Sequence, residues 1–270
     1  MNIFKINANL SRKTAHLLSA LLFIISIGLY IEVARVRHQN NPSESLTPTI
    51  SQMIDGFNRQ AFEKDKRTGE YELLVDTIAS ARRFLISLAI LFLAVILGLH
   101  MGIQPYIESV FLRFITFFDK ISPIALVPIL FIVFGLGDAS KVALIVIAVF
   151  PVICLDTYLR AKAVHSEQII KGKTLAATDL EVTYRIVLPQ IFPQVLDTIR
   201  LNFKSMILLL LASEMLGANA GLGYRIFLVR KFTAFDVIIP YVIWISVLAY
   251  TLDFLFRLWI RKRYSWSINN

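Results

Sequence analysis

Long apolar stretches, some without a single acidic or basic side chain, recur along this sequence. Residues 14–31 and 84–107 contain no Asp, Glu, Lys or Arg. A helix needs about 20 mostly apolar residues to cross the hydrocarbon core of a bilayer. Charged residues make up only 17% of the chain, against roughly 25% in soluble domains. These features exclude a soluble globular protein and predict an all-α, polytopic membrane protein.

Four further stretches bring the prediction to about six transmembrane helices. The third helix is expected to begin near Ile107 and to reach residue 137. Pro123 and Pro128 are expected to bend it, because proline lacks the N–H that an intact helical turn requires. The remaining three helices are predicted at 140–160, 195–217 and 237–256.

Basic residues gather before the first helix, within 160–204 and after the sixth helix. Because cytoplasmic loops carry an excess of Lys and Arg, these segments and both termini are predicted to be cytoplasmic. The net charge of +9 is split among clusters that apolar stretches separate, which argues against a nucleic-acid-binding face. No small-residue cleavage site follows residues 14–31, so the first helix is expected to remain uncleaved.

The loop 35–83 is placed on the outer side, although it mixes basic and acidic residues. Within it, residues 49–62 have the pattern of an amphipathic helix. Two interpretations stay open for this helix: a surface element that covers the spans, or a surface that receives a partner.

Residues able to carry catalysis are scattered or missing. The four histidines fall on different segments and form no HExxH spacing, and neither a GxSxG nor a GxxxxGK[ST] motif is present. Cys154 is the only cysteine, which excludes an intrachain disulfide and a multi-cysteine metal site. The sequence therefore predicts a chain without catalytic or metal-binding residues, suited to transport, channel activity or scaffolding.

The polar segment 167–196 is expected to contain a short amphipathic helix on the cytoplasmic side. Its apolar positions recur at helical spacing: Leu175, Ala176, Leu180, Tyr184 and Val187. Leu188 and Pro189 are expected to end the helix. The small residues Gly172 and Ala177, with Ala176, would let the surface of another protein approach closely. The periodicity fits equally well a helix lying under the bilayer.

Three stretches resemble the inner-membrane permease subunits of ABC importers with the type I fold, most closely the nitrate, taurine and alkanesulfonate group. They are KTLAATDLEVTYRIVLPQIFPQVLDTIRL, ISPIALVPILFIVFGLGDASKVALI and SEMLGANAGLGYRI. The first resembles the coupling-helix region, whose pattern ends in Leu-Pro, here Leu188 and Pro189. Where the family has Glu-Ala-Ala this chain has Ile170, Lys171 and Gly172, and Ala176 replaces the family's glycine.

The resemblance implies a division of the chain into an N-terminal tail, first helix and periplasmic loop at 1–73, a permease core at 74–262, and a cytoplasmic tail at 263–270. The coupling helix is expected at about 168–187. The residues expected to contact the ATPase are Lys171, Gly172, Thr174, Leu175, Ala176, Ala177, Leu188 and Pro189.

The resemblance also implies a set of partners in the bacterial inner membrane. Two ABC ATPase subunits would bind ATP and Mg, so the chain itself would hold no cofactor. A second permease copy or a related permease would complete the pathway, and a periplasmic binding protein would deliver the solute. Lipid would surround the helices, and no nucleic acid is expected.

Polar residues within the spans are candidates for the solute pathway or its gate. These are Asp119, Ser122, Asn202 and Glu214. Alternatives stay open: Asp119 would pair with Lys120 or Arg113 at a helix bend, and Glu214 would reach interfacial water. Asp156 and Asp253 are expected to pair with Arg160 and Arg257, four residues further along each helix.

The sequence thus predicts the permease subunit of an ATP-driven importer of a small polar solute. An ATP-independent secondary transporter or channel is the first alternative, and a non-transporting scaffold or sensor with the same fold is the second.

Overall fold

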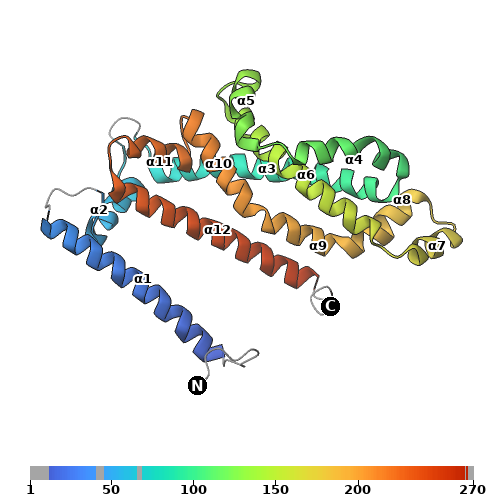
Figure 1. The fold of residues 1–270 in the computed structure, drawn as a ribbon, viewed down its shortest axis with the longest axis horizontal. Coiled ribbons are helices and arrows are strands. Elements are labelled where there is room, and N and C mark those ends of the chain that lie inside the picture. The colour runs from blue at the N-terminus through green and yellow to red at the C-terminus, as the bar shows by residue number, and fades with distance from the viewer. Residues whose placement is uncertain (1–11, 41–45, 66–68, 265, 267–270) are drawn as a thin grey trace.

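The structure, a computed structural model, describes residues 12–40, 46–65, 69–264 and 266. Every regular element in these ranges is a helix, which confirms the predicted all-α architecture (Figure 1). The elements are α1 (Arg12–Asn40), α2 (Ile50–Phe62), α3 (Glu72–Ile103), α4 (Pro105–Asp119), η1 (Pro123–Leu126), α5 (Val127–Phe134), α6 (Asp138–Lys162), α7 (Ser166–Thr174), α8 (Asp179–Glu181), η2 (Val182–Val187), α9 (Leu188–Leu201), α10 (Phe203–Gly217), α11 (Leu222–Arg230) and α12 (Phe235–Arg263).

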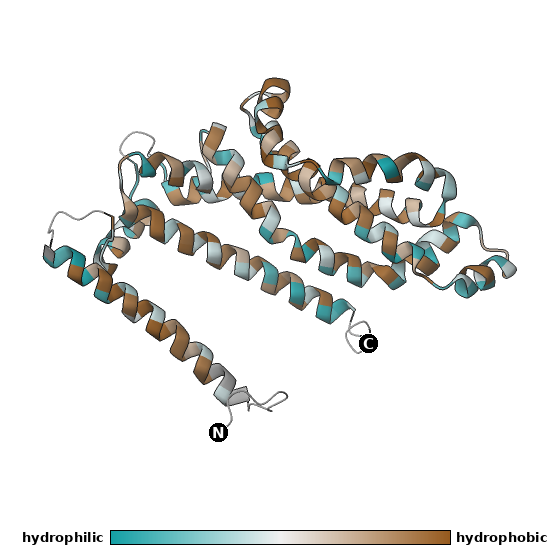
Figure 2. Ribbon diagram, in the orientation of Figure 1, coloured by the Kyte–Doolittle hydropathy of each residue, from teal (hydrophilic) through white to brown (hydrophobic). Residues whose placement is uncertain are grey.

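Four helices, α1, α3, α6 and α12, are each long and apolar enough to cross a membrane. Two bent pairs raise the number of candidate spans to six: Pro105–Asp119 with Pro123–Phe134, and Asp179–Gly217 with Leu222–Arg230. Figure 2 shows apolar residues along the long helices and polar residues at α7 and at the C-terminal end of α12. The hydropathy of the chain therefore follows the pattern expected of a membrane protein.

The predicted third span is broken more sharply than expected. The helices before and after residues 120–122 meet at 90°. Ser122 has an extended backbone, φ −69° and ψ 116°, because the residue before a proline is disfavoured in the helical region. Pro123 and Pro128 then occupy first turns of η1 and α5, where a missing N–H costs nothing. The prolines start new helices here rather than bending one helix.

The first helix of the core begins at Glu72, well before the predicted start at residue 84. Its first turns contain Asp76, Ser80 and Arg83, and these polar side chains are buried and bonded to other helices. Charged and polar residues lower the local hydropathy, which is why the sequence predicts that these residues belong to the outer loop 35–83 rather than to a membrane helix. The outer loop is also shortened at its other end, because α1 continues to Asn40.

The main hydrophobic core lies between α3, α6, α9 and α10. In the part where α3 meets α6, glycines allow the two backbones to approach closely: a Cβ on Gly98 would overlap the carbonyl oxygen of Cys154, and one on Gly102 would overlap the Ala161 side chain. Small residues serve this purpose at many membrane helix contacts. The α3–α6 pair is therefore the rigid centre of the bundle.

The predicted amphipathic helix at 49–62 is present as α2. Thr49 caps it, with Gln52 completing a capping box. Gly56 packs on the backbone of Asp236, and Arg59 forms a 2.9 Å ion pair with the same residue. The helix thus covers the N-terminal end of α12, as expected for a surface element. The helix α1, by contrast, stands apart from the bundle in Figure 1 and is exposed along most of its length.

Candidate functional site

The predicted coupling helix at 168–187 is not a single helix. Instead, α7 ends at Thr174, a turn covers 175–178, and the chain resumes as α8 at Asp179. Thr178 caps α8: the Glu181 N–H donates to its Oγ1 at 3.3 Å, and the Thr178 N–H donates to Glu181 Oε2 at 3.0 Å. The apolar periodicity continues through the turn, which is why the sequence pattern did not reveal the break.

Ala176 closes α7 in a backbone conformation that favours glycine. Its φ is +60°, and the Ala176 and Ala177 N–H groups donate to the carbonyls of Lys173 and Gly172 at 3.0 and 3.1 Å. This is the Schellman ending of a helix, with Ala176 at the left-handed position that is usually glycine. Leu175, just before it, is 84% exposed. The turn therefore presents a large apolar side chain to the outside on a fixed backbone.

Ala176→Gly is expected to stabilise this turn by about 1 kcal/mol, because glycine adopts positive φ without the steric cost that alanine has. Hydrogen exchange of the Ala176 and Ala177 amides should slow accordingly in the variant. Ala218→Gly is a suitable control, because Ala218 has a φ of −105° and the same substitution there relieves no strain. Equal protection in wild type and Ala176→Gly would contradict the expected strain.

Gly172 was predicted to lie on the surface that another protein approaches, but it does not face outward. It is buried, and a Cβ there would lie 2.6 Å from Cδ1 of Ile186 on η2. Lys171 and Thr174 are exposed, while Ala177 is half-buried against the core. The glycine therefore fits α7 onto its own chain, and the surface left for a partner consists of the exposed residues around Leu175.

Pro189 does not end a helix either, because η2 passes directly into α9. The six residues of η2 form a π-helical stretch, in which the Leu188 N–H donates to the Thr183 carbonyl five residues back. This wider turn accommodates a proline ring that would clash in a regular α-helix. Pro189 lies exposed in the first turn of α9, and Leu188 packs against the core.

The π-helical stretch is joined to α3 by a contact that the sequence pattern did not reveal. The Tyr184 hydroxyl and His100 Nε2 share a hydrogen bond of 2.9 Å, and the two rings meet edge to face at 5.6 Å. The segment from α7 to η2 is thus connected both to α9, along the chain, and to the end of α3.

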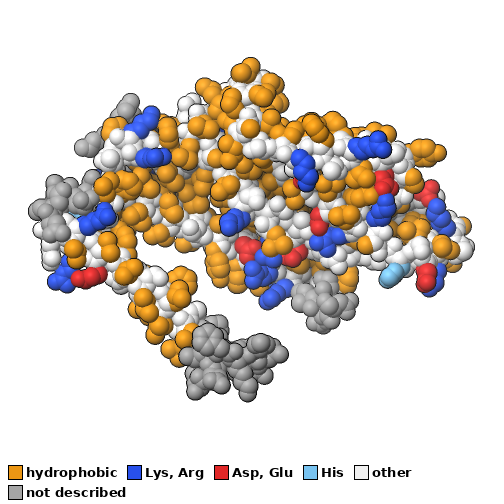
Figure 3. All heavy atoms as spheres, in the orientation of Figure 1, with side chains coloured by type: hydrophobic (Ala, Val, Ile, Leu, Met, Phe, Trp, Pro, Cys, Tyr) orange, Lys and Arg blue, Asp and Glu red, His pale blue; other side chains and the backbone are white. Residues whose placement is uncertain are grey.

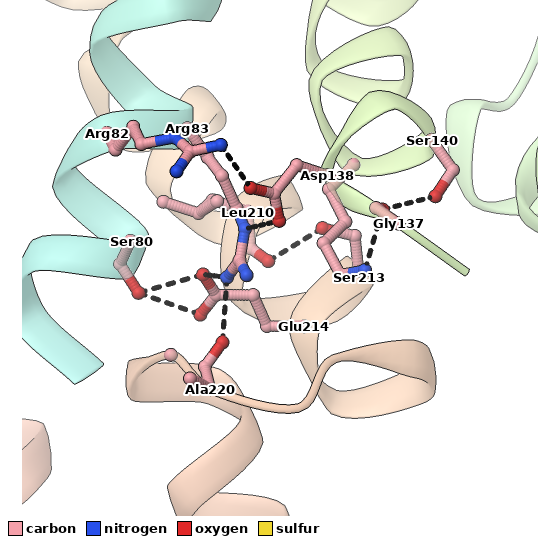
Figure 4. Close-up of polar contacts among 12 residues, drawn as sticks. Ser80, Arg82, Arg83, Gly137, Asp138, Ser140, Leu210, Ser213, Glu214 and Ala220 are labelled. Atoms are coloured by element: carbon pink, nitrogen blue, oxygen red, sulfur yellow. Dashed lines mark hydrogen bonds and ion pairs between the residues drawn. The ribbon is translucent and has the colours of Figure 1, made fainter. Parts of the chain in front are cut away.

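A second cluster of polar residues lies at the other end of α3, around Glu214. The Arg83 guanidinium donates to Glu214 Oε1 at 2.6 Å and to Asp138 Oδ1 at 2.7 Å, which joins α3, α10 and α6 (Figure 4). The Ser80 hydroxyl and the Gly223 N–H also donate to the Glu214 carboxylate. Glu214 is fully buried, so it does not reach interfacial water as one interpretation proposed.

Further bonds hold the turn between α10 and α11 against α3. Asp76 accepts from the Gly221 N–H at 2.9 Å and pairs with Arg225 at 2.8 Å. Gly221 has a φ of +139°, and a Cβ there would lie 2.6 Å from the Glu214 carboxyl carbon. Lys141, also buried, donates to the carbonyls of Leu136, Gly137 and Gly217. The spacing of Asp76, Ser80 and Arg83 on one helical face is the sequence signal that identifies this cluster.

The four candidate pathway residues are not brought together. Asp119 and Ser122 lie at the bend between α4 and η1, and Asn202 lies between α9 and α10. Asp119 pairs with Lys120 at 2.8 Å, and Asn202 donates to the Thr198 carbonyl at 2.9 Å. Within the described ranges, no hydrogen bond joins any two of Asp119, Ser122, Asn202 and Glu214. Their role in a pathway stays a prediction.

The predicted intrahelical ion pairs are confirmed. Arg160 contacts Asp156 at 2.7 Å, and Arg257 contacts Asp253 at 2.9 Å. Across the described residues, no group of three or more His, Cys, Asp and Glu side chains is arranged to hold a metal ion.

Comparison with known proteins identifies the family. Residues 90–263 match the family described as the binding-protein-dependent transport system inner membrane component. The chain is 28% identical to the taurine transport system permease protein TauC of Escherichia coli over 190 residues, covering 70% of this chain and 69% of that protein. It is 32% identical to a putative ABC transporter permease protein of Methanocaldococcus jannaschii over 190 residues, covering 68% and 70%.

A shorter similarity extends to the formylaminopyrimidine transport permease protein ThiX of Halalkalibacterium halodurans, 32% identical over 144 residues, covering 53% of this chain and 57% of that protein. The family match includes α6, α7, α8, η2 and α9, and therefore the whole segment predicted to couple to an ATPase. Subunits of this family are not themselves catalytic, in agreement with the sequence. The chain therefore belongs to the binding-protein-dependent inner membrane component family and is a permease subunit of an ABC transport system.

Proposed function

We propose that this permease subunit works in an importer, in which ATP-driven movement admits a small polar solute delivered by a periplasmic binding protein. The ATPase subunits bind ATP and Mg, and a second permease copy or a related permease completes the pathway. Both termini and the α7–α8 segment face the cytoplasm. The observation that carries this proposal is the exposed Leu175 on the fixed turn between α7 and α8.

The contacts of the α7–α8 segment support its role in transmitting movement. A force on Leu175 acts on α7, which is fitted to η2 through Gly172 and Ile186. From η2 the chain continues into α9, and the His100–Tyr184 contact leads to α3. Chains of packed side chains and rigid helices are the physical means by which distant sites are coupled.

The cluster around Glu214 lies at the end of α3 opposite to His100, so α3 connects it to the α7–α8 segment. The Arg83 bonds to Glu214 and Asp138 tie α3 to α10 and α6, so these helices respond together when α3 moves. In the proposed orientation this cluster lies on the outer side, near the surface to which a binding protein delivers solute. Glu214 then acts as a positioning residue for an outer gate.

ATP hydrolysis in a reconstituted complex tests this function. The full-length permease is placed in nanodiscs with its ATPase subunit, and hydrolysis is measured with and without the solute-loaded binding protein. An importer is expected to hydrolyse ATP several-fold faster when the binding protein is added. A secondary transporter would not change the rate of the ATPase, and a scaffold would bind the ATPase without a response to the binding protein; either result would contradict the proposal.

A further inference from the structure

A pocket of about 450 Å³ lies between α6, α9 and α12. Four arginines line it: Arg160, Arg200, Arg257 and Arg261. Asp197, Gln194, Pro193 and Ile260 complete its walls. Figure 3 shows a group of basic and acidic side chains near the C-terminal end of α12, beside apolar side chains of the same face. Neither the coupling segment nor the Glu214 cluster contributes to this pocket.

Carboxylates hold two of the arginines in place. Arg160 is fixed by Asp156 at 2.7 Å and by Gln194 at 2.9 Å. Arg200 is fixed by Asp197 at 2.8 Å and by Asp253 at 2.7 Å, and its side chain is only 13% exposed. These two charges are thus held in place in the wall of the pocket.

The other two arginines keep donors available. Arg257 donates to Asp253 through Nη2, and among the described residues neither its other nitrogens nor Arg261 has a protein acceptor. Asp156, Asp197 and Asp253 balance only three of the four guanidinium charges. The pocket therefore has a net positive charge and unused N–H groups, which suit a phosphate group.

The surroundings of the pocket resemble a membrane–water boundary. Trp259 on α12 and Trp266 just beyond it are exposed, and the basic run Arg261, Lys262 and Arg263 ends the helix. Aromatic and basic residues mark the level of the lipid headgroups. Tyr250 and Phe254, on the same face of α12 as Arg257 and Arg261, are also exposed and offer an apolar surface where an acyl chain would lie.

We propose that this pocket binds the phosphate group of an anionic phospholipid headgroup. Basic pockets between membrane helices on the cytoplasmic side have the charge that such headgroups require. A soluble phosphate carries the same group, but the adjacent apolar surface of α12 favours the lipid as its source. Binding would link α6, α9 and α12 at the boundary of the bilayer, independently of the solute and of the direction of transport.

Native mass spectrometry of the delipidated full-length protein in detergent tests the proposal, with phosphatidylglycerol and phosphatidylcholine as probes. Phosphatidylglycerol is expected to bind more tightly. The loss of one arginine near the headgroup is expected to weaken phosphatidylglycerol binding about fivefold. The double variant Arg257→Gln with Arg261→Gln is therefore expected to weaken it about 30-fold. Asp253 remains bonded to Arg200 in this double variant, so no carboxylate is left without a partner.

The matched control is Lys262→Gln with Arg263→Gln, which removes the same charge from the same helix end but outside the pocket. This control is expected to keep phosphatidylglycerol affinity. Equal affinity for the two lipids, or an equal loss in both double variants, would overturn the proposal. Displacement of phosphatidylglycerol by inorganic phosphate would assign the pocket to a soluble anion instead of a lipid.

Discussion

Arg83→Met is expected to lower the free energy of unfolding by about 3–5 kcal/mol. Among the described residues, Arg83 is the only one that forms an ion pair with Glu214, whose carboxylate is fully buried between α3, α10 and α11. The Ser80 hydroxyl and the Gly223 N–H would remain as donors, but neither balances a charge. Leaving one member of a buried ion pair uncompensated costs far more than the intact pair contributes.

The neighbouring arginine provides the control. Arg82 pairs with Asp138 at 3.1 Å, but its side chain is 68% exposed, against 7% for Arg83. Arg82→Met is therefore expected to change stability by about 0–1 kcal/mol, as is usual for exposed ion pairs. Both variants can be compared by denaturant unfolding of the purified protein in detergent micelles.

A double variant separates loss of charge balance from loss of packing. Arg83→Met combined with Glu214→Gln removes both charges, so most of the stability lost in Arg83→Met should return. If Arg83→Met is no more destabilising than Arg82→Met, or if Glu214→Gln brings no recovery, the ion pair does not hold α3 to α10 as described.

The membrane helices were predictable because hydropathy is a local property of the sequence. An uninterrupted run such as 84–107 needs no knowledge of distant residues to be recognised. The beginning of α3 was missed for the opposite reason. Arg83 and Glu214 are 131 residues apart in the sequence, and each residue appears too polar for a buried position until its partner is known.

The coupling segment shows a second limit of sequence patterns. Apolar spacing alone predicted one helix over 168–187, whereas the chain forms α7, a turn, α8 and η2. The sequence does contain the signal for the new start, since Thr178 and Glu181 fit the capping-box pattern. The positive φ of Ala176 has no such signal, because the residue there is not glycine.

Leu175→Asp is expected to release the ATPase subunit from the permease. Leu175 is the one large apolar residue in the turn between α7 and α8, and it is 84% exposed. The few side chains that dominate an interface lie near its centre and contribute about 2 kcal/mol or more each, and Leu175 is proposed to be one of them. An aspartate at the same place would also have to give up its hydration, so retention should fall by roughly 30-fold or more.

Leu136→Asp is the matched control, because Leu136 is also an exposed leucine in a short loop, 63% exposed, but lies between α5 and α6 near the Glu214 cluster. When each permease is purified without the ATPase subunit, both variants should elute from gel filtration as the wild type does. In the proposed orientation only the Leu175 substitution faces the ATPase.

The most direct test of the account is affinity purification of the tagged, full-length protein in mild detergent, followed by mass spectrometry of the bound partners and measurement of ATP hydrolysis in the eluate. Wild type and Leu136→Asp are expected to retain a nucleotide-binding subunit and its activity, and Leu175→Asp is expected to lose both. Retention of the ATPase by Leu175→Asp at the wild-type level would show that the turn between α7 and α8 is not where this permease couples to ATP hydrolysis.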